Sequence, residues 1–241
     1  MSNKFWKSFT IVLHVLFDEI EIQQIVFTEA YTNSDDVELV NMLIDYTEID
    51  VSADNNYAIC WASKRGHIDV VNRLLQDRRV DPSANDNYTI RFASHNGHIA
   101  IVNRLLQDRR VDPSADVNSA IRRASHYGHI TVVERLLQNS RVDPSDGNNS
   151  AIRLSSEYGH VDVVDRLLQD SRVDPSANNN LAIRYSSGYG HIAVVDRLLQ
   201  DRRVDPSDDY NYAIRVASIN GHIAVVDRLL QEDRSKTELI Q

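Results

Sequence analysis

Cysteine is almost absent from this chain, because Cys60 is the only one among 241 residues. A single cysteine excludes a disulfide within the chain and is compatible with a reducing compartment such as the cytoplasm. Basic residues are also scarce, since 26 Lys and Arg face 35 Asp and Glu and leave a net charge of −9. Affinity for a nucleic-acid backbone comes largely from Lys and Arg, so this balance argues against nucleic acid as the main partner. No apolar run reaches the length that crosses a membrane.

Proline is the next scarce residue, and its placement reveals a repeat. All five prolines are spaced by 31 residues, and the six Gly-His pairs follow the same period. The prolines are Pro82, Pro113, Pro144, Pro175 and Pro206, and the pairs are Gly66-His67, Gly97-His98, Gly128-His129, Gly159-His160, Gly190-His191 and Gly221-His222. Self-similarity at a fixed period of this size is the signature of a stacked solenoid.

One copy of the repeat, residues 182–206, predicts two helices and a loop. The apolar residues within 192–199 have the spacing of a broad helix face that turns toward a core. Gly190 precedes them and permits the positive φ of a tight turn between two helices. Asp205-Pro206 ends the second helix and begins an extended connection to the next copy.

These residues resemble the ankyrin repeat, which is a β-turn and two helices with a TPLHxA signature. Residues 57–62 (YAICWA) and 212–217 (YAIRVA) occupy the signature, and the GHIxVVxxLL half matches more faithfully. The period of 31 departs from the usual value of about 33. The resemblance implies an all-α, ankyrin-type α-solenoid of stacked helix-turn-helix repeats with short hairpin-like loops. The repeat style also looks like the divergent arrays abundant in large DNA viruses, which implies a protein of the host cytoplasm.

The repeat register divides the chain into four segments. Residues 1–25 do not fit the repeat and are predicted to be an N-terminal capping segment, since a signal peptide would need a small-residue cleavage site that is missing. Residues 26–56 are predicted to be a degenerate first repeat. Six ankyrin-like repeats, including a C-terminal capping repeat, are expected over 57–234, with first helices starting near 57, 88, 119, 150, 181 and 212. Residues 235–241 are a polar tail.

Repeated polar residues are predicted to have structural roles. An Asn before each first helix is expected to accept a hydrogen bond from the first turn as an N-cap. The Gly-His histidines are expected to form turn and inter-repeat hydrogen bonds. A metal role is rejected because copies in a helix stack lie about 10 Å apart, whereas zinc needs ligands near 2 Å from one point.

Two rows of arginine are also predicted to be structural. Arginines at the TPLH histidine position should pair with loop carboxylates such as Asp112 or Asp143, because unpaired burial is costly. A second row in the second helix is predicted to form a solvated outer face. The first row is Arg91, Arg122, Arg153, Arg184 and Arg215, and the second is Arg73, Arg104, Arg135, Arg166, Arg197 and Arg228.

Motifs for catalysis are missing from the sequence. Residues 188–193 satisfy GxGxxA, but a dinucleotide fingerprint needs a strand before it and here a helix is expected. No P-loop, HExxH site or nucleophile–base–orienter set is recognisable. The sequence therefore predicts no enzyme, no cofactor, no metal site and no catalytic residue.

Partner contacts are predicted at the positions that vary between copies, which are the loop tips and the pair before each glycine. By the ankyrin resemblance, that pair faces a concave groove. The predicted partner-binding residues are Arg65, His95, Asn96, His126, Tyr127, Tyr158, Tyr189 and Asn220. Three of them form a tyrosine row, and tyrosine is common among binding hot spots. The alternative is that these rings only cover the ends of the first helices. Aromatic residues such as Trp61, Phe92 and Tyr185 are predicted to serve packing between repeats.

The favoured function is a non-enzymatic module that binds an unknown protein, a host protein if the source is viral, through the concave face and the loop tips. The chain is expected to be a monomer, without nucleic-acid or membrane partners. The alternative is an adaptor or substrate receptor for a larger assembly such as a ubiquitin ligase. Such adaptors usually carry a second domain, for which the terminal segments leave no room, so a stand-alone competitor is preferred. An enzyme or a nucleic-acid binder is the remote alternative.

Overall fold

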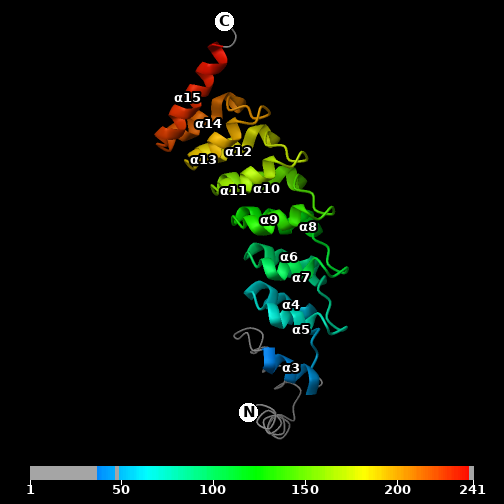
Figure 1. Ribbon diagram of the computed structural model, residues 1–241. Helices are drawn as coiled ribbons and strands as arrows, with labels where there is room; N and C mark the ends of the chain where they lie inside the picture. Colours follow the sequence, from blue (N-terminus) through cyan, green and yellow to red (C-terminus); the bar gives the residue numbers. More distant parts are fainter. Residues whose placement is uncertain (1–36, 47–48, 239–241) are drawn as a thin grey trace. The chain divides into compact units, whose positions relative to one another are not determined.

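The computed structural model describes residues 37–46 and 49–238, and within these ranges the chain forms helices and no strand (Figure 1). The predicted all-α class is confirmed. The helices are α3 (Val37–Tyr46), α4 (Ala53–Arg65), α5 (Ile68–Leu74), α6 (Ala84–His95), α7 (Ile99–Leu105), α8 (Ala115–His126), α9 (Ile130–Leu137), α10 (Asp146–Glu157), α11 (Val161–Leu168), α12 (Ala177–Gly188), α13 (Ile192–Leu199), α14 (Asp208–Ile219) and α15 (Ile223–Glu238). From α4 onward they alternate as the first and second helices of the repeats.

The chain divides into two compact units, Met1–Asp112 and Pro113–Gln241. In the first unit α4 packs against α6, α5 against α7, and α3 against α5. In the second unit the first helices α8, α10, α12 and α14 stack in order, and so do the second helices α9, α11, α13 and α15. Within each unit, first helices therefore pack on first helices and second helices on second helices, as expected when each repeat contacts only its neighbours. The predicted segment 1–25 lies outside the described residues, and 26–56 is described from Val37.

A continuous apolar core runs through each stack. Val163, Val164 and Leu167 of α11 are fully buried, together with Ala151 and Ile152 of α10. Burying one such Val, Leu or Ile side chain contributes roughly 1.5–3 kcal/mol. The identical spacing in each repeat places the same side chains in the same layer, so the second helices form an apolar row along the stack.

A turn of three left-handed residues precedes the right-handed part of each first helix. In α4 these residues are Asp54, Asn55 and Asn56, with φ of 52°, 56° and 62°. Asn and Asp tolerate this conformation better than other residues with a side chain, which explains why the loops are rich in them. Val117 and Tyr210 are the exceptions in α8 and α14. The right-handed helix of α4 begins after Asn56, close to the predicted start.

The predicted N-cap role of the repeated asparagine is wrong. Asn149 has φ of 57° and is buried, and its Oδ1 accepts a hydrogen bond from the backbone N–H of Asp174, 2.7 Å away in the next loop. The same bond joins Asn56 to Asp81 in the first unit, also at 2.7 Å. The asparagines of the five repeats before the last one therefore each connect their repeat to the following loop, because the left-handed turn directs the amide toward that loop.

The Gly-His pairs connect neighbouring repeats, as predicted. Nε2 of His191 lies 2.9 Å from the carbonyl oxygen of Glu157, and Nε2 of His160 lies 2.8 Å from that of His126. Gly159 has φ of 79°, and a Cβ added to it would lie 2.7 Å from Nδ1 of His191. Glycine is therefore required there both by its backbone conformation and by the close approach of the next histidine.

A further inter-repeat contact comes from an arginine that sequence reasoning missed. Arg172 donates to both carboxylate oxygens of Asp170, at 2.9 and 2.7 Å, and its Nη1 donates to the carbonyl of Val142 in the preceding loop at 2.8 Å. Equivalent contacts start from Arg79, Arg110 and Arg203. The hydrogen bond from Arg172 holds the pKa of Asp170 below its ordinary value despite partial burial.

The two predicted arginine rows differ from expectation. In the first row only part of the prediction holds: Arg184 pairs with the loop carboxylate of Asp209 at 2.7 Å, whereas Arg122 donates to the carbonyl of Val117 at 3.0 Å. In the second row Arg73 and Arg228 are half-buried, and each forms an ion pair that the sequence pattern did not predict. They pair with Asp45 at 2.5 Å and Asp196 at 2.7 Å in the preceding repeats. Stacking brings these carboxylates into reach.

Candidate partner-binding surface

The tyrosine row predicted from the sequence lies at the ends of three successive first helices in the second unit. Tyr127, Tyr158 and Tyr189 directly follow α8, α10 and α12 and are 46%, 50% and 58% exposed. Each residue occupies the same place in its repeat, one position before the turn glycine. Neighbouring first helices pack on each other, so these rings lie on successive layers of one stack.

His126 joins two of these tyrosines. Its ring stacks on Tyr127 with centroids 4.3 Å apart and on Tyr158 of the next repeat with centroids 4.2 Å apart. Burial lowers the pKa of His126, against an opposite effect of Glu157 and with help from His160 and Arg123. The imidazole is therefore mainly neutral at pH 7, which suits stacking between phenol rings. The three rings form a preorganised aromatic surface that a partner can contact with little loss of side-chain freedom.

Tyr189 and Asn220 complete the predicted residues of the second unit. The Tyr189 ring lies 6.3 Å from that of His191, at 24°. Asn220 is exposed, and its Nδ2 donates to the carbonyl of Gly188 at 2.7 Å. Asn220 therefore connects the last turn to the preceding one, in addition to any contact with a partner.

The other three predicted residues lie in the first unit. Asn96 donates from Nδ2 to the carbonyl of Phe92 at 2.8 Å, and the His95 ring lies 5.6 Å from the Phe92 ring. The Arg65 guanidinium lies 4.8 Å from the centroid of Trp61. The structure thus groups His95 and Arg65 with an aromatic side chain of a first helix, and Asn96 with the backbone of Phe92.

Lys64 belongs to the variable pair before Gly66, where partner contacts are predicted, and its Nζ also lies 4.8 Å from the Trp61 centroid. Trp61 was assigned to packing between repeats, but its side chain is only half-buried and carries two cations. The signal was present in the sequence, because residues three and four positions after Trp61 share its helix face.

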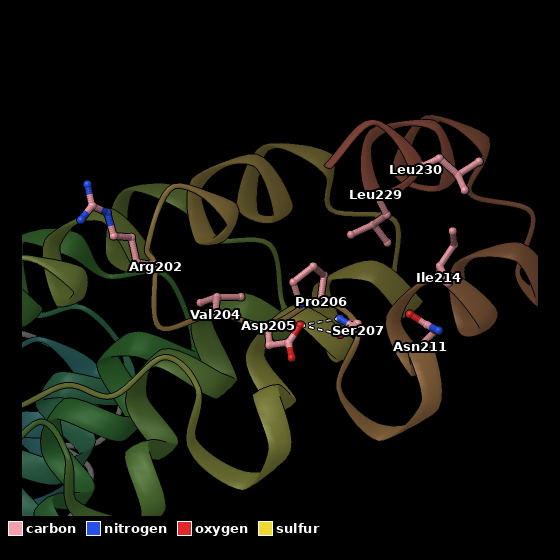
Figure 2. Close-up of a pocket in the computed structure, with 9 residues that line it drawn as sticks. All are labelled: Arg202, Val204, Asp205, Pro206, Ser207, Asn211, Ile214, Leu229 and Leu230. Carbon is pink, nitrogen blue, oxygen red and sulfur yellow. Dashed lines mark hydrogen bonds between the residues drawn. The ribbon is translucent and has the colours of Figure 1, made fainter. Parts of the chain in front are cut away.

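The hollow drawn in Figure 2 has a volume of about 630 Å³ and lies on the last repeat, between the loop before α14 and helix α15. Its lining is mainly apolar, with Val204, Pro206 and Ile214 among its residues. The Ser207 hydroxyl donates to the Asp205 carboxylate at 2.7 Å, and no histidine belongs to the lining to activate it. This hollow lacks a nucleophile–base pair for acyl transfer.

Potential metal ligands and the single thiol of the described residues do not form a reactive site either. In residues 37–46 and 49–238 no group of three or more His, Cys, Asp or Glu is arranged to hold a metal ion. Cys60 is buried, and burial raises the pKa of its thiol to about 12, so the thiol stays protonated at neutral pH. Among the described helices, none combines the length and the apolar character needed to span a bilayer.

Comparison with known proteins identifies the repeat. A family model for ankyrin repeats (3 copies) matches residues 90–180, and one for ankyrin repeats (many copies) matches residues 59–106. Together the matches cover about half of the chain, over 59–180. No curated protein matches the chain significantly. The matched residues, the helix pairs and their stacking within each unit show that the chain belongs to the ankyrin-repeat family.

Proposed function

We propose that this protein binds a partner protein through the turns that follow its first helices and through the adjoining loop tips, and that it catalyses no reaction. Ankyrin repeats are generally protein–protein interaction modules, which supports the general role. The proposed contact residues are Tyr127, Tyr158, Tyr189, His126 and Asn220 in the second unit, with Arg65, His95 and Asn96 in the first.

The observation that carries the proposal is the exposed tyrosine row. The turn glycines and histidines next to it are fixed by inter-repeat packing, whereas the tyrosines leave about half of each side chain in solvent. A tyrosine offers a large contact area at a low entropic cost. Three of them on successive layers, two joined by His126, form the type of centre at which interface energy concentrates.

Substitution of the row tests the proposal. Affinity capture with the wild type, followed by mass spectrometry, supplies the strongest binary partner, whose affinity is then measured by calorimetry. The triple variant Tyr127→Ala, Tyr158→Ala and Tyr189→Ala should weaken binding by tenfold or more, since the loss of even one hot-spot contact costs about 2 kcal/mol. The matching triple Tyr→Phe variant keeps the rings and should bind within about threefold of wild type. A folded triple-alanine variant with unchanged affinity would contradict the proposal.

An adaptor role is the alternative, in which the same surface delivers the partner to a larger assembly such as a ubiquitin ligase. Recovery of ligase subunits that survives the triple-alanine substitution would favour it. We further propose that the protein acts as a monomer in the cytoplasm, that of the host cell if its source is a virus. Support for a reducing compartment is the single cysteine, Cys60, which is buried and free.

A further inference from the structure

Two cations lie on aromatic rings at the surface of the first unit. Lys64 Nζ and the Arg65 guanidinium carbon are each 4.8 Å from the centroid of Trp61. Lys64 Nζ also lies 5.7 Å from the ring of Phe92 in the next repeat. The ring faces carry negative electrostatic potential and hold the two cations in place without neutralising their charge.

The rings beneath these cations form one stacked pair on each of the neighbouring helices α4 and α6. Tyr57 stacks on Trp61 with centroids 5.7 Å apart, and Tyr88 stacks on Phe92 at 3.9 Å. Helices α4 and α6 pack against each other, and Tyr57 is 41% exposed. We call the set Tyr57, Trp61, Lys64, Arg65 and Phe92 the cation–aromatic surface. It combines apolar area with positive charge on the side of the first helices.

The two cations differ from several arginines of this chain in lacking a carboxylate partner. Within the described ranges, neither Lys64 nor Arg65 forms an ion pair, whereas Arg79 and Arg110, for example, pair with carboxylates at 2.7 Å. Since both cations are 4.8 Å from one centroid, they are no further apart than twice that distance. That upper limit is close to the Debye length of about 8–10 Å at 0.1–0.15 M salt, so one short anionic segment can reach both cations.

We propose that the cation–aromatic surface binds an acidic linear segment of a protein partner. Carboxylates of that segment contact Lys64 and Arg65, and an apolar side chain next to them packs on the rings of Trp61 and Phe92. The inference rests on the proposed function, because it names the chemistry of one segment that such a partner presents. It adds Trp61, which the sequence assigns to packing between repeats, and it gives Lys64 of the variable pair a specific type of contact.

The arrangement favours a peptide over a nucleic acid. Nucleic-acid affinity grows with the number of phosphates neutralised, and the strong salt dependence of charge-driven binding arises at about 6–10 such contacts. Here two cations meet at one tryptophan and do not extend as a stripe, and the whole chain carries a net charge of −9. Two closely spaced cations with apolar rings beside them match a short segment that alternates carboxylates with apolar side chains.

Fluorescence of Trp61 provides a local readout. The chain has two tryptophans, so Trp6→Phe leaves Trp61 as the only emitter. The probe is an eight-residue peptide of glutamates with two phenylalanines, compared with its lysine counterpart and with poly(U). The glutamate peptide should change the Trp61 emission with a saturable dependence, and its affinity should fall as salt screens the charges. The lysine peptide should not bind.

A charge-matched pair of variants then locates the site. The variant K64Q/R65Q should weaken glutamate-peptide binding by tenfold or more. The control R78Q/R109Q removes two exposed cations of the same unit and the same net charge, and should bind within twofold of the parent. Equal weakening in both variants would show that only overall charge matters and would overturn the proposal.

Two further outcomes would overturn it. One is binding of poly(U) in place of the glutamate peptide, which would make the surface a nucleic-acid site. The other is that neither the glutamate peptide nor poly(U) changes the Trp61 emission. Failure here is distinct from failure of the proposed function: if the captured partner still depends on Tyr127, Tyr158 and Tyr189, only the acidic-segment inference is lost.

Discussion

Substitution of Gly159 by Ala should destabilise the protein for two separable reasons. The glycine has φ of +79°, and an alanine in the left-handed region costs about 1–2 kcal/mol. The new Cβ would also lie 2.7 Å from Nδ1 and 2.9 Å from Cε1 of His191. That ring is held by its 2.9 Å hydrogen bond to the carbonyl of Glu157, so it must shift and lose the bond. A net hydrogen bond contributes about 0.5–1.5 kcal/mol, giving an expected total of about 1.5–3.5 kcal/mol.

Gly221 provides a matched control within the same chain. Its φ is +75°, but a Cβ added there would meet nothing within 4 Å. Gly221→Ala should therefore cost only the backbone term of about 1–2 kcal/mol. The comparison isolates the contact with the histidine of the following repeat, because both glycines have a similar positive φ and precede a histidine.

A double-mutant cycle makes the test stricter. Gly159→Ala, His191→Ala and the double variant are unfolded in urea and followed by circular dichroism. Removal of the His191 ring removes the obstacle, so Gly159→Ala should cost less in the His191→Ala background than alone, by about 1 kcal/mol or more. Equal costs at Gly159 and Gly221, or no relief in the double variant, would refute the idea that the histidine ring limits this position.

Three further predictions concern two loop residues and the fall in stability at acid pH. Val117→Asn should raise stability by up to about 1 kcal/mol, because a β-branched side chain that is 49% exposed occupies a left-handed position; a lower urea midpoint would contradict this. Asn149→Ala should cost about 1–3 kcal/mol, since it removes the acceptor of a loop N–H, whereas Asn211→Ala in the last repeat should cost far less, as urea unfolding can show. The hydrogen bond from Arg172 lowers the pKa of Asp170 in the folded state. The ionised carboxylate therefore stabilises the fold at pH values above its ordinary pKa of 3.8, and this stabilisation is lost as the pH falls through the lowered pKa of the folded state. The Arg172→Gln variant should therefore lose less stability between pH 5 and pH 2 than wild type in acid titrations, in the range that roughly brackets these pKa values.

The sequence alone determined the helix pairs and the family. A strict period and a broad apolar face, as in residues 192–199, predict a stack of helix pairs, because each repeat can bury its apolar face only against neighbouring copies. The Gly-His bonds between repeats were also predictable, since a turn glycine followed by a histidine recurs at every junction. The tyrosines could be placed on the turns, because they directly precede the turn glycines.

Only the tertiary structure decided which polar atoms meet across the stack. The sequence pattern predicts an N-cap at Asn149 because the hydrogen-bond donor of an N-cap lies in the same helix. The donor that Asn149 binds lies 25 residues further along the chain. Arg172 was overlooked because its carbonyl acceptor lies 30 residues earlier. Likewise, Trp61 became a candidate surface only when its half-buried ring was seen to hold Lys64 and Arg65. Sequence patterns report which side chains turn toward a core, but the partners of polar side chains depend on the stacking of whole repeats, which no single repeat specifies.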